Sequence, residues 1–231
     1  MNKCRNFTLI ELLVVIGIIV LLAGLLLPTI LGGQQKARIT QAKADMSSIM
    51  MVLKEVESTY NRMVKESSTK DEFNFNGKKV KATSNGSGTD DGMTLILGEP
   101  GKADSIDAYY AFIAELSDPN NSGLTSLNIN LRKRKFLDPK TKYNATEKYD
   151  TADNLKQSWI DPWGNPYVLL LNTDFSDKIK VPSGKIISGK VAMYSLGPNG
   201  SDEKGQNTLY DTDISGSEKV KKIADDVTSW N

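Results

Sequence analysis

The chain has 231 residues, and its 29 lysines and arginines nearly balance its 28 aspartates and glutamates. This near-neutral charge supports neither a nucleic-acid partner nor a disordered acidic chain. Histidine is absent and Cys4 is the only cysteine, which excludes a Ser-His-Asp triad, a Cys-His pair, a histidine zinc site and an internal disulfide. We therefore expect a protein without enzymatic activity.

The first element is an apolar segment from Phe7 to Leu31. At a helical rise of about 1.5 Å per residue it is long enough to cross a bilayer. Lys3 and Arg5 precede it, as in a signal peptide or a signal anchor. However, an Ala-x-Ala cleavage pattern is missing at its far end, and Glu11 places a carboxylate inside it at a cost of about 2.5 to 3.5 kcal/mol, which a plain anchor would not need.

The N-terminus resembles the prepilin signature shared by type IV pilins and type II secretion pseudopilins, in the residues Arg5-Asn6-Phe7-Thr8-Leu9-Ile10-Glu11-Leu12-Leu13-Val14-Val15. Pro28 also falls where that family carries a proline. The resemblance implies cleavage between Asn6 and Phe7 by a membrane prepilin peptidase, followed by methylation of the Phe7 amine. The family normally has glycine where this chain has Asn6. We expect the new amine to pair with Glu11 of a neighbouring subunit, which neutralises both charges on assembly.

A second helical pattern follows Gly32-Gly33. Its apolar residues recur at steps of three and four and form one stripe, made of Ile39, Ala42, Met46, Ile49, Leu53, Val56, Tyr60 and Met63. The stripe suits either a coiled coil or an amphipathic helix that packs on a sheet. We expect one helix from Phe7 to about Val64, with a bend or a local break near Pro28 and the two glycines.

The middle of the chain is mainly polar. We expect residues 66–91 to form an exposed excursion with a hairpin at Phe73 to Val80. Apolar residues at helical spacing predict a short helix from Asp104 to Leu116, which ends before Pro119. The basic run at residues 132–135 is expected to be a solvated charged face, because no aromatic residues are interleaved with it.

The C-terminal half carries the strand signals. Residues 166–171 and 186–196 are apolar or β-branched runs that predict an antiparallel hairpin. A turn rich in proline and glycine precedes the first run, and we expect its large apolar Trp163 to anchor the hairpin on the helix stripe. The turn is the motif Asp161-Pro162-Trp163-Gly164-Asn165-Pro166-Tyr167. This motif resembles one in the major, G-type pseudopilin of type II secretion, as do Tyr194 to Gly200 and Asp225 to Trp230, although residues 66–149 are longer than in that family.

Carboxylates and an amide flank a long loop near the C-terminus, at Asn199, Asp202, Asp225 and Asp226. Such oxygens suit a hard cation, and a solvated acidic loop is the alternative. The resemblance to major pseudopilins implies a calcium site made by the Leu196 carbonyl, Asn199, Asp225 and Asp226. Asn199 stands where the family has an aspartate, so this site would carry one charge fewer.

The expected fold class is α+β: a long N-terminal helix, partly transmembrane and partly amphipathic, packed pilin-like on a small antiparallel sheet. The expected segments are a leader at 1–6, a transmembrane assembly helix at 7–31, an amphipathic helix at 32–66 and a globular C-terminal domain at 67–231.

The resemblance implies a structural subunit of a type II secretion pseudopilus in the bacterial inner membrane, with a cytoplasmic N-terminus and a periplasmic globular domain. Its implied partners are further copies, other pseudopilins, prepilin peptidase, the membrane and the inner-membrane secretion platform. The alternatives are a type IV pilus or DNA-uptake minor pilin, or a signal-anchored extracytoplasmic binding protein.

Overall fold

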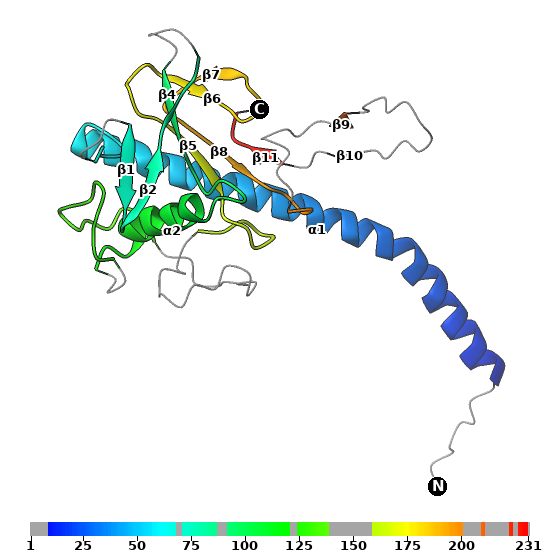
Figure 1. Cartoon of the computed structure of the whole chain (residues 1–231). Helices are drawn as coiled ribbons and strands as arrows, with labels where there is room; N and C mark the ends of the chain where they lie inside the picture. Colours follow the sequence, from blue (N-terminus) through cyan, green and yellow to red (C-terminus); the bar gives the residue numbers. More distant parts are fainter. Residues whose placement is uncertain are drawn as a thin grey trace. The chain divides into compact units, whose positions relative to one another are not determined.

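The structure is a computed structural model, and it describes residues 9–67, 71–86, 92–120, 124–138, 159–200, 209–210, 222–223 and 226–230. Of residues 24–32, 209–210 and 222–223 only the backbone is described. The chain divides into two compact units, Met1–Thr40 and Gln41–Asn231. The second unit contains all the strands and the second helix (Figure 1), and we call it the head unit.

Helix α1 (Leu9–Tyr60) supplies the described part of the first unit. The helix is continuous through Pro28 and Gly33, so the predicted local break is not found. A single proline removes one hydrogen bond of the helix, and the remaining bonds keep the backbone helical on either side. The large apolar side chains from Leu9 to Leu22 are 47 to 81% exposed.

Among the described residues, no helix combines the length and the apolar character that a membrane crossing requires. The predicted crossing at 7–31 extends into residues that the structure does not describe.

Helix α1 ends at Tyr60, four residues before the predicted end at Val64. Asn61 has a φ of 60° and donates its backbone N–H to the Glu57 carbonyl over 2.7 Å. Asparagine tolerates this left-handed conformation better than most residues and commonly terminates helices in this way. The chain therefore turns at Asn61, and Met63 and Val64 become buried as part of a loop.

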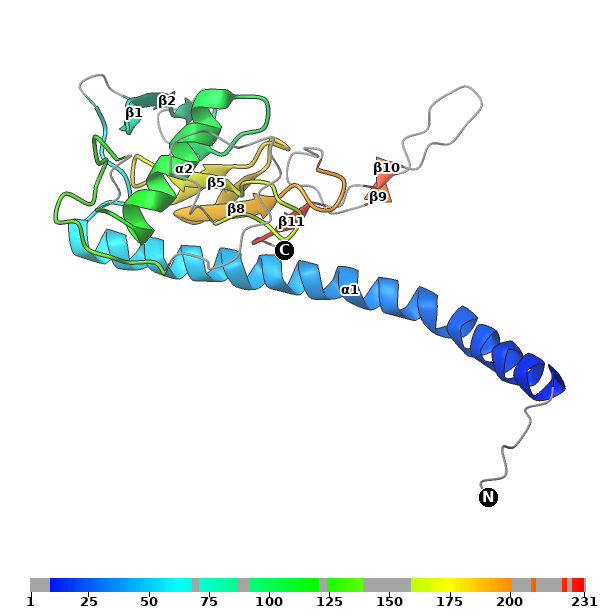
Figure 2. The ribbon, with the colours of Figure 1, turned by 90° about the horizontal axis from the view of Figure 1, so that it is seen from below.

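The predicted apolar stripe of α1 is confirmed in the head unit. Five of its members are at most 1% exposed, namely Ala42, Met46, Ile49, Leu53 and Val56. Figure 2 shows this part of α1 running along the strands β5 and β8 of the same unit. The stripe is thus covered by the chain's own sheet, as expected for an amphipathic helix and in contrast to a coiled coil.

Polar contacts also join this part of α1 to the rest of the head unit. They involve side chains spread from Asp45 to Tyr60, and each joins α1 to a residue at least 70 positions away in the sequence. The four contacts are Tyr167 to Asp45 at 2.9 Å, Arg134 to Glu55 at 2.7 Å, Lys190 to Glu57 at 2.6 Å and Tyr60 to Asn130 at 2.9 Å.

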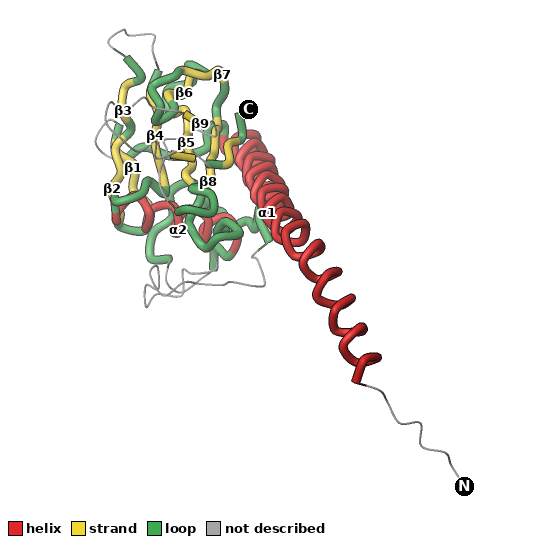
Figure 3. The backbone as a smooth tube through the Cα atoms, turned by 90° about the vertical axis from the view of Figure 1, so that its right-hand side faces the viewer, coloured by secondary structure: helices red, strands yellow, loops and turns green. Residues whose placement is uncertain are grey.

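The central sheet has five antiparallel strands in the order β11-β8-β5-β4-β3. They are β3 (Thr83–Ser84), β4 (Met93–Leu97), β5 (Val168–Asn172), β8 (Val191–Ser195) and β11 (Val227–Thr228). Every residue of β5 is buried, because this strand lies in the middle of the sheet between β4 and β8 (Figure 3), and its Val168 and Leu170 pack with Ile179 in one apolar cluster. A separate pair, β9 (Leu209–Tyr210) and β10 (Lys222–Ile223), is also antiparallel.

The predicted hairpin at Phe73 to Val80 is confirmed as β1 (Glu72–Phe75) and β2 (Lys78–Lys81). Asn76 and Gly77 form its turn with φ values of 50° and 88°, as a two-residue hairpin turn requires. The expectation that this region is an exposed excursion is wrong for Phe73 and Phe75, which are both 1% exposed.

The second arm predicted at residues 186–196 is divided in two. Its first part, β7 (Ile186–Ser188), pairs with β6 (Lys178–Lys180), and only β8 pairs with β5. The chain leaves one sheet and enters the other at Gly189, whose N–H donates to the Asp177 carbonyl over 2.8 Å. The apolar pattern runs through this point because residues on both sides contribute to the core.

Helix α2 (Ala103–Ser117) confirms the helix predicted from Asp104 to Leu116. Most of its residues are buried, because it lies against β1, β2 and β4 (Figure 2). The rings of Phe112 and Phe75 meet edge to face with centroids 5.4 Å apart, which fixes the hairpin β1-β2 on the helix.

Candidate functional site

The first candidate site is the exposed apolar surface at the start of α1. Glu11 is the acidic residue of the first helical turn, and the large apolar side chains around it are exposed to solvent. Apolar surface of this extent on one helix stabilises a structure only when something covers it. The predicted cleavage site between Asn6 and Phe7 lies outside the described residues, and the backbone of Pro28 lies within α1.

The second candidate site is built around Asp161, the first residue of the turn motif. Its Oδ1 accepts hydrogen bonds from the backbone N–H groups of Trp163 at 3.0 Å and Asn165 at 2.7 Å. The backbone N–H of Asp161 donates to the Asn165 carbonyl at 2.8 Å, which closes the turn. A short polar side chain that accepts bonds from backbone N–H groups a few residues further on is typical of turn-forming aspartates.

Asp161 also joins this motif to the one at Tyr194 to Gly200. Its Oδ2 accepts a hydrogen bond of 2.6 Å from the Ser195 hydroxyl, which in turn accepts the Gly197 N–H at 3.1 Å. The Asn165 side chain lies 3.6 Å from the position that a Cβ on Gly200 would take. Two motifs that are separate in the sequence therefore form one structure where β5 begins and β8 ends.

The environment of Asp161 affects its ionisation. Burial raises the pKa of Asp161 above its ordinary value, and the hydrogen bonds from Ser195, Asn165 and Trp163 act in the opposite direction. Burial disfavours the charged form because it removes water from the carboxylate, whereas donors to the carboxylate favour it.

The last residue of the motif, Tyr167, connects it to α1. Tyr167 is fully buried, and its hydroxyl donates to Asp45 on the stripe of α1 at 2.9 Å. Gly98 lies against the Tyr167 backbone so closely that a Cβ there would be 2.3 Å from the Tyr167 carbonyl oxygen. Tyr167, where we had expected Trp163, is thus the residue whose contact with α1 is described.

Trp163 is half-buried in the turn. Its Nε1 is shielded from solvent and has no hydrogen-bond partner among the described residues.

The predicted calcium ligands are only partly brought together. The register of β11 on β8 pairs Val227 with Ser195 and so places Asp226 across from Leu196; both are at most 2% exposed. Asn199 is exposed, and Asp225 lies outside the described residues. Within the described ranges, no group of three or more histidine, cysteine, aspartate or glutamate side chains is placed to hold a metal ion.

One buried polar cluster was missed by sequence reasoning. The Glu115 carboxylate on α2 accepts backbone N–H groups from Asn128 and Ile129 at 2.7 Å each, and also from Asn130. Asn128 binds both the N–H and the C=O of Lys65, at 2.7 and 2.8 Å. Burial raises the pKa of Glu115, and the three backbone donors oppose that rise. The signal in the sequence is one acidic residue within the apolar run of α2.

Residues 1–27 match the family model described as the prokaryotic N-terminal methylation motif. The chain carries that motif. A methylation motif of this kind is typical of type IV pilin-like proteins, and it suggests a membrane-anchored N-terminus. The match spans the predicted cleavage site, Glu11 and the apolar start of α1. No curated protein and no solved structure matches the chain.

Proposed function

We propose that this chain is a structural, non-enzymatic subunit of a pilus-like filament, of the type II secretion pseudopilus kind. Prepilin peptidase would cleave it before Phe7, and copies would then assemble through their N-terminal helices at the bacterial inner membrane, with the head on the periplasmic side. The proposed partners are further copies, other pseudopilins and the inner-membrane secretion platform.

The observation that carries this proposal is the methylation motif at the start of an exposed apolar helix. Side chains from Leu9 to Leu22 are exposed around Glu11 and are not covered by residues of the same unit. An apolar helix can bury such a surface against lipid or against the same helix of another copy. In the second environment Glu11 can pair with the amine that cleavage creates on Phe7 of the neighbouring copy.

The arrangement of the head unit supports the same proposal. Two motifs that resemble those of a major pseudopilin meet at the hydrogen bond between Asp161 and Ser195. The motif also contacts α1 through Tyr167 and Asp45. The globular part is therefore held firmly on the helix that would assemble the filament.

The test has two readouts on the full chain produced with prepilin peptidase. The mass of the mature chain should show loss of residues 1–6 and a methylated Phe7. A Cys4→Ser, Ile16→Cys chain should give a ladder of crosslinked copies in membranes, because Ile16 is an exposed apolar residue of α1.

Glu11→Leu in that background should reduce the ladder at least about tenfold, because an unpaired ammonium would be left in apolar surroundings. Glu11→Asp, which keeps the carboxylate, is the matched control. An uncut chain, or a ladder that Glu11→Leu leaves unchanged, would contradict the proposal.

A further inference from the structure

The loop that leaves β5 carries oxygen atoms at every second residue. β5 ends at Asn172, and β6 begins at Lys178. The series consists of the side chains of Asn172, Asp174 and Ser176, followed by the backbone carbonyl of Lys178. We call these four groups the β5–β6 loop site. Their spacing is that of an EF-hand calcium loop, in which the first, third and fifth positions supply side-chain oxygens and the seventh supplies a backbone carbonyl.

The four groups converge on one point. The Asn172 amide nitrogen lies 2.8 Å from Asp174 Oδ1, 2.9 Å from Ser176 Oγ and 3.0 Å from the Lys178 carbonyl oxygen. An amide nitrogen carries two hydrogens, so it cannot give each of the three oxygens a hydrogen of its own. Calcium is surrounded by oxygens in the same way, at slightly shorter distances of about 2.3 to 2.6 Å.

The Asn172 side chain has an unused oxygen at this point of the fold. Asn172 is only 7% exposed, and its carboxamide oxygen accepts no hydrogen bond from any described residue. A half-turn of the carboxamide exchanges its oxygen and its nitrogen. Four oxygens then face one another, and a cation between them removes their mutual repulsion.

Asp174 gives the site one full negative charge. Burial acts to raise the pKa of Asp174, but hydrogen bonds to its oxygens outweigh burial and lower that pKa, which keeps the carboxylate ionised. Asp174 forms no ion pair with any described residue. The nearest lysine along this loop is engaged elsewhere, because Lys190 bonds Glu57 at 2.6 Å and approaches Asp177 at 3.9 Å. The charge of Asp174 is therefore left for a cation.

The backbone of the loop also follows the calcium-loop pattern. Phe175 and Asp177 have φ values of 62° and 55° and turn the chain between successive ligands. Asp177 occupies the sixth position, where the EF-hand loop has a glycine for its sharp turn. The ligand positions are thus brought to one side of the loop.

Two segments outside the loop hold the site in place. The Asn85 side chain donates to the Lys178 carbonyl at 3.1 Å and accepts the Thr94 hydroxyl at 2.6 Å. Gly92 lies so close to Ser176 that a Cβ on it would be 2.3 Å from Ser176 Oγ. The oxygens are thus preorganised by parts of the chain that are distant in the sequence, as a binding site requires.

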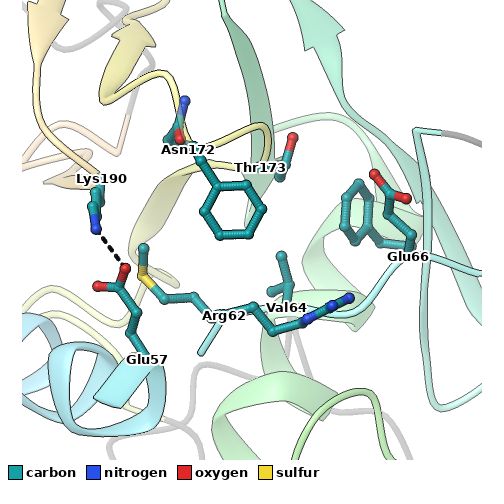
Figure 4. Close-up of a pocket in the computed structure, with 10 residues that line it drawn as sticks. Glu57, Arg62, Val64, Glu66, Asn172, Thr173 and Lys190 are labelled. Atoms are coloured by element: carbon teal, nitrogen blue, oxygen red, sulfur yellow. Dashed lines mark hydrogen bonds and ion pairs between the residues drawn. The ribbon is translucent and has the colours of Figure 1, made fainter. Parts of the chain in front are cut away.

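The site opens onto a pocket that water can enter. Asn172 and Thr173 line this pocket, which has a volume of about 210 Å³ and lies beside the end of α1 (Figure 4). Calcium takes about six to eight oxygens, and the twelfth position of the loop holds Ser183 where an EF-hand has glutamate. Water from the pocket can supply the remaining ligands, at about 30 Å³ per molecule.

We propose that the β5–β6 loop site binds one calcium ion through its four oxygen groups. Calcium suits neutral amide, hydroxyl and carbonyl oxygens in a flexible loop, whereas magnesium demands a near-ideal octahedron and holds its water. With one carboxylate, the affinity should lie in the range of about 10⁻⁴ to 10⁻³ M that extracellular modules have. The ion would fix the point where the chain passes from the central sheet to the β6–β7 pair. This inference goes beyond the filament role and does not depend on it.

The first test is the thermal unfolding midpoint of the detergent-solubilised full chain with Asp226→Ala, which removes the calcium site predicted near the C-terminus. Calcium at ten times the dissociation constant should raise the midpoint by about 3 to 6 °C, and magnesium should raise it less. Asp174→Asn should abolish the calcium effect. Asp177→Asn is the matched control, because it makes the same charge change in the same loop at a position that supplies no ligand, and it should keep the effect.

The second test is Asn172→Asp in the same background. Without calcium this variant should have a lower midpoint, because its carboxylate cannot donate to the three oxygens and repels Asp174. Calcium should restore the midpoint, at a concentration about tenfold lower than the unsubstituted site needs, because the site gains a second charge.

A purely structural network gives the opposite results. It predicts that Asn172→Asp stays destabilised at every calcium concentration, and that Asp174→Asn and Asp177→Asn respond to calcium alike. Either result would overturn the inference, and neither would affect the test of the filament role by the Ile16→Cys ladder.

Discussion

Asp161 holds the two motifs of the head together, and two substitutions there should have very different effects. Asp161→Ala removes the acceptor of three hydrogen bonds, from Trp163, Asn165 and Ser195. A hydrogen bond to a charged group contributes about 1.5 to 3 kcal/mol and a neutral one about 0.5 to 1.5. Because two of the three donors are only partly buried, we expect Asp161→Ala to destabilise the head by about 3 to 5 kcal/mol.

Asp161→Asn should cost about 1 kcal/mol or less. Its amide oxygen still accepts from the N–H groups of Trp163 and Asn165. Its NH₂ group replaces the oxygen that faces Ser195, but the Ser195 hydroxyl can rotate and accept from it. The substitution also removes the cost of burying a charge.

The two substitutions also differ from wild type in their pH dependence. Burial raises the folded-state pKa of Asp161 above its ordinary value of 3.8, so the folded state binds the proton more tightly than the unfolded state does. The corresponding stability is fully present below pH 3.8 and is lost as the pH rises through the folded-state pKa. Asp161→Asn cannot titrate, so its stability should fall less than that of wild type over this range.

Urea unfolding followed by tryptophan fluorescence measures these effects in the detergent-solubilised full chain, because all three tryptophans, Trp159, Trp163 and Trp230, lie in the head unit. Equal midpoints for Asp161→Ala and Asp161→Asn would refute the assignment of the acceptor bonds. A pH profile of Asp161→Asn that matches wild type would refute the assigned direction of the pKa change.

Three further outcomes are expected in the same unfolding assay. Gly98→Ala should destabilise the head by about 2 kcal/mol or more, since the φ of Gly98 is 79° and the new Cβ would meet the Tyr167 carbonyl. The control is Gly101→Ala, because Gly101 has a similar φ and no neighbour within 4 Å. An unchanged midpoint for Gly98→Ala would contradict the close approach. Trp163→Ala should cost about 1 to 3 kcal/mol, less than a fully buried aromatic residue would; coincident midpoints would place the ring outside the packed core. In the Asp174→Asn chain, calcium should raise the thermal unfolding midpoint more than magnesium does, and adding Asp226→Ala should abolish this difference. If calcium raises the midpoint with Asp226→Ala as much as without it, the site predicted near the C-terminus is ruled out.

Local patterns were sufficient to predict the helices and one hairpin. The stripe from Ala42 to Val56 and the apolar spacing in α2 repeat at short range, and each pattern follows from the geometry of one element. The turn at Asn76 and Gly77 likewise depends only on its own residues. Such features can be predicted because the sequence neighbours that cause them are also neighbours in space.

Features that depend on distant residues were not predicted. The cluster around Glu115 brings Asn128 and Lys65 together from separate parts of the chain, and no periodic pattern signals it. The division of the second strand run at Gly189 depends on the Asp177 carbonyl that receives its N–H. In the candidate site, the motif from Asp161 to Tyr167 was recognised, but its bonds to Ser195 and Asp45 depend on tertiary contacts.

The polar contacts along α1 have a mechanical consequence. Asp45, Glu55, Glu57 and Tyr60 are spread over about 22 Å of helix at 1.5 Å per residue, and together they are bonded to three different segments of the head. A pull along the helix axis loads all four bonds and the buried stripe at the same time, in shear, and sliding by even one residue breaks every one of them together. Force applied to the helix is therefore shared across the whole head, and no single contact has to bear it alone.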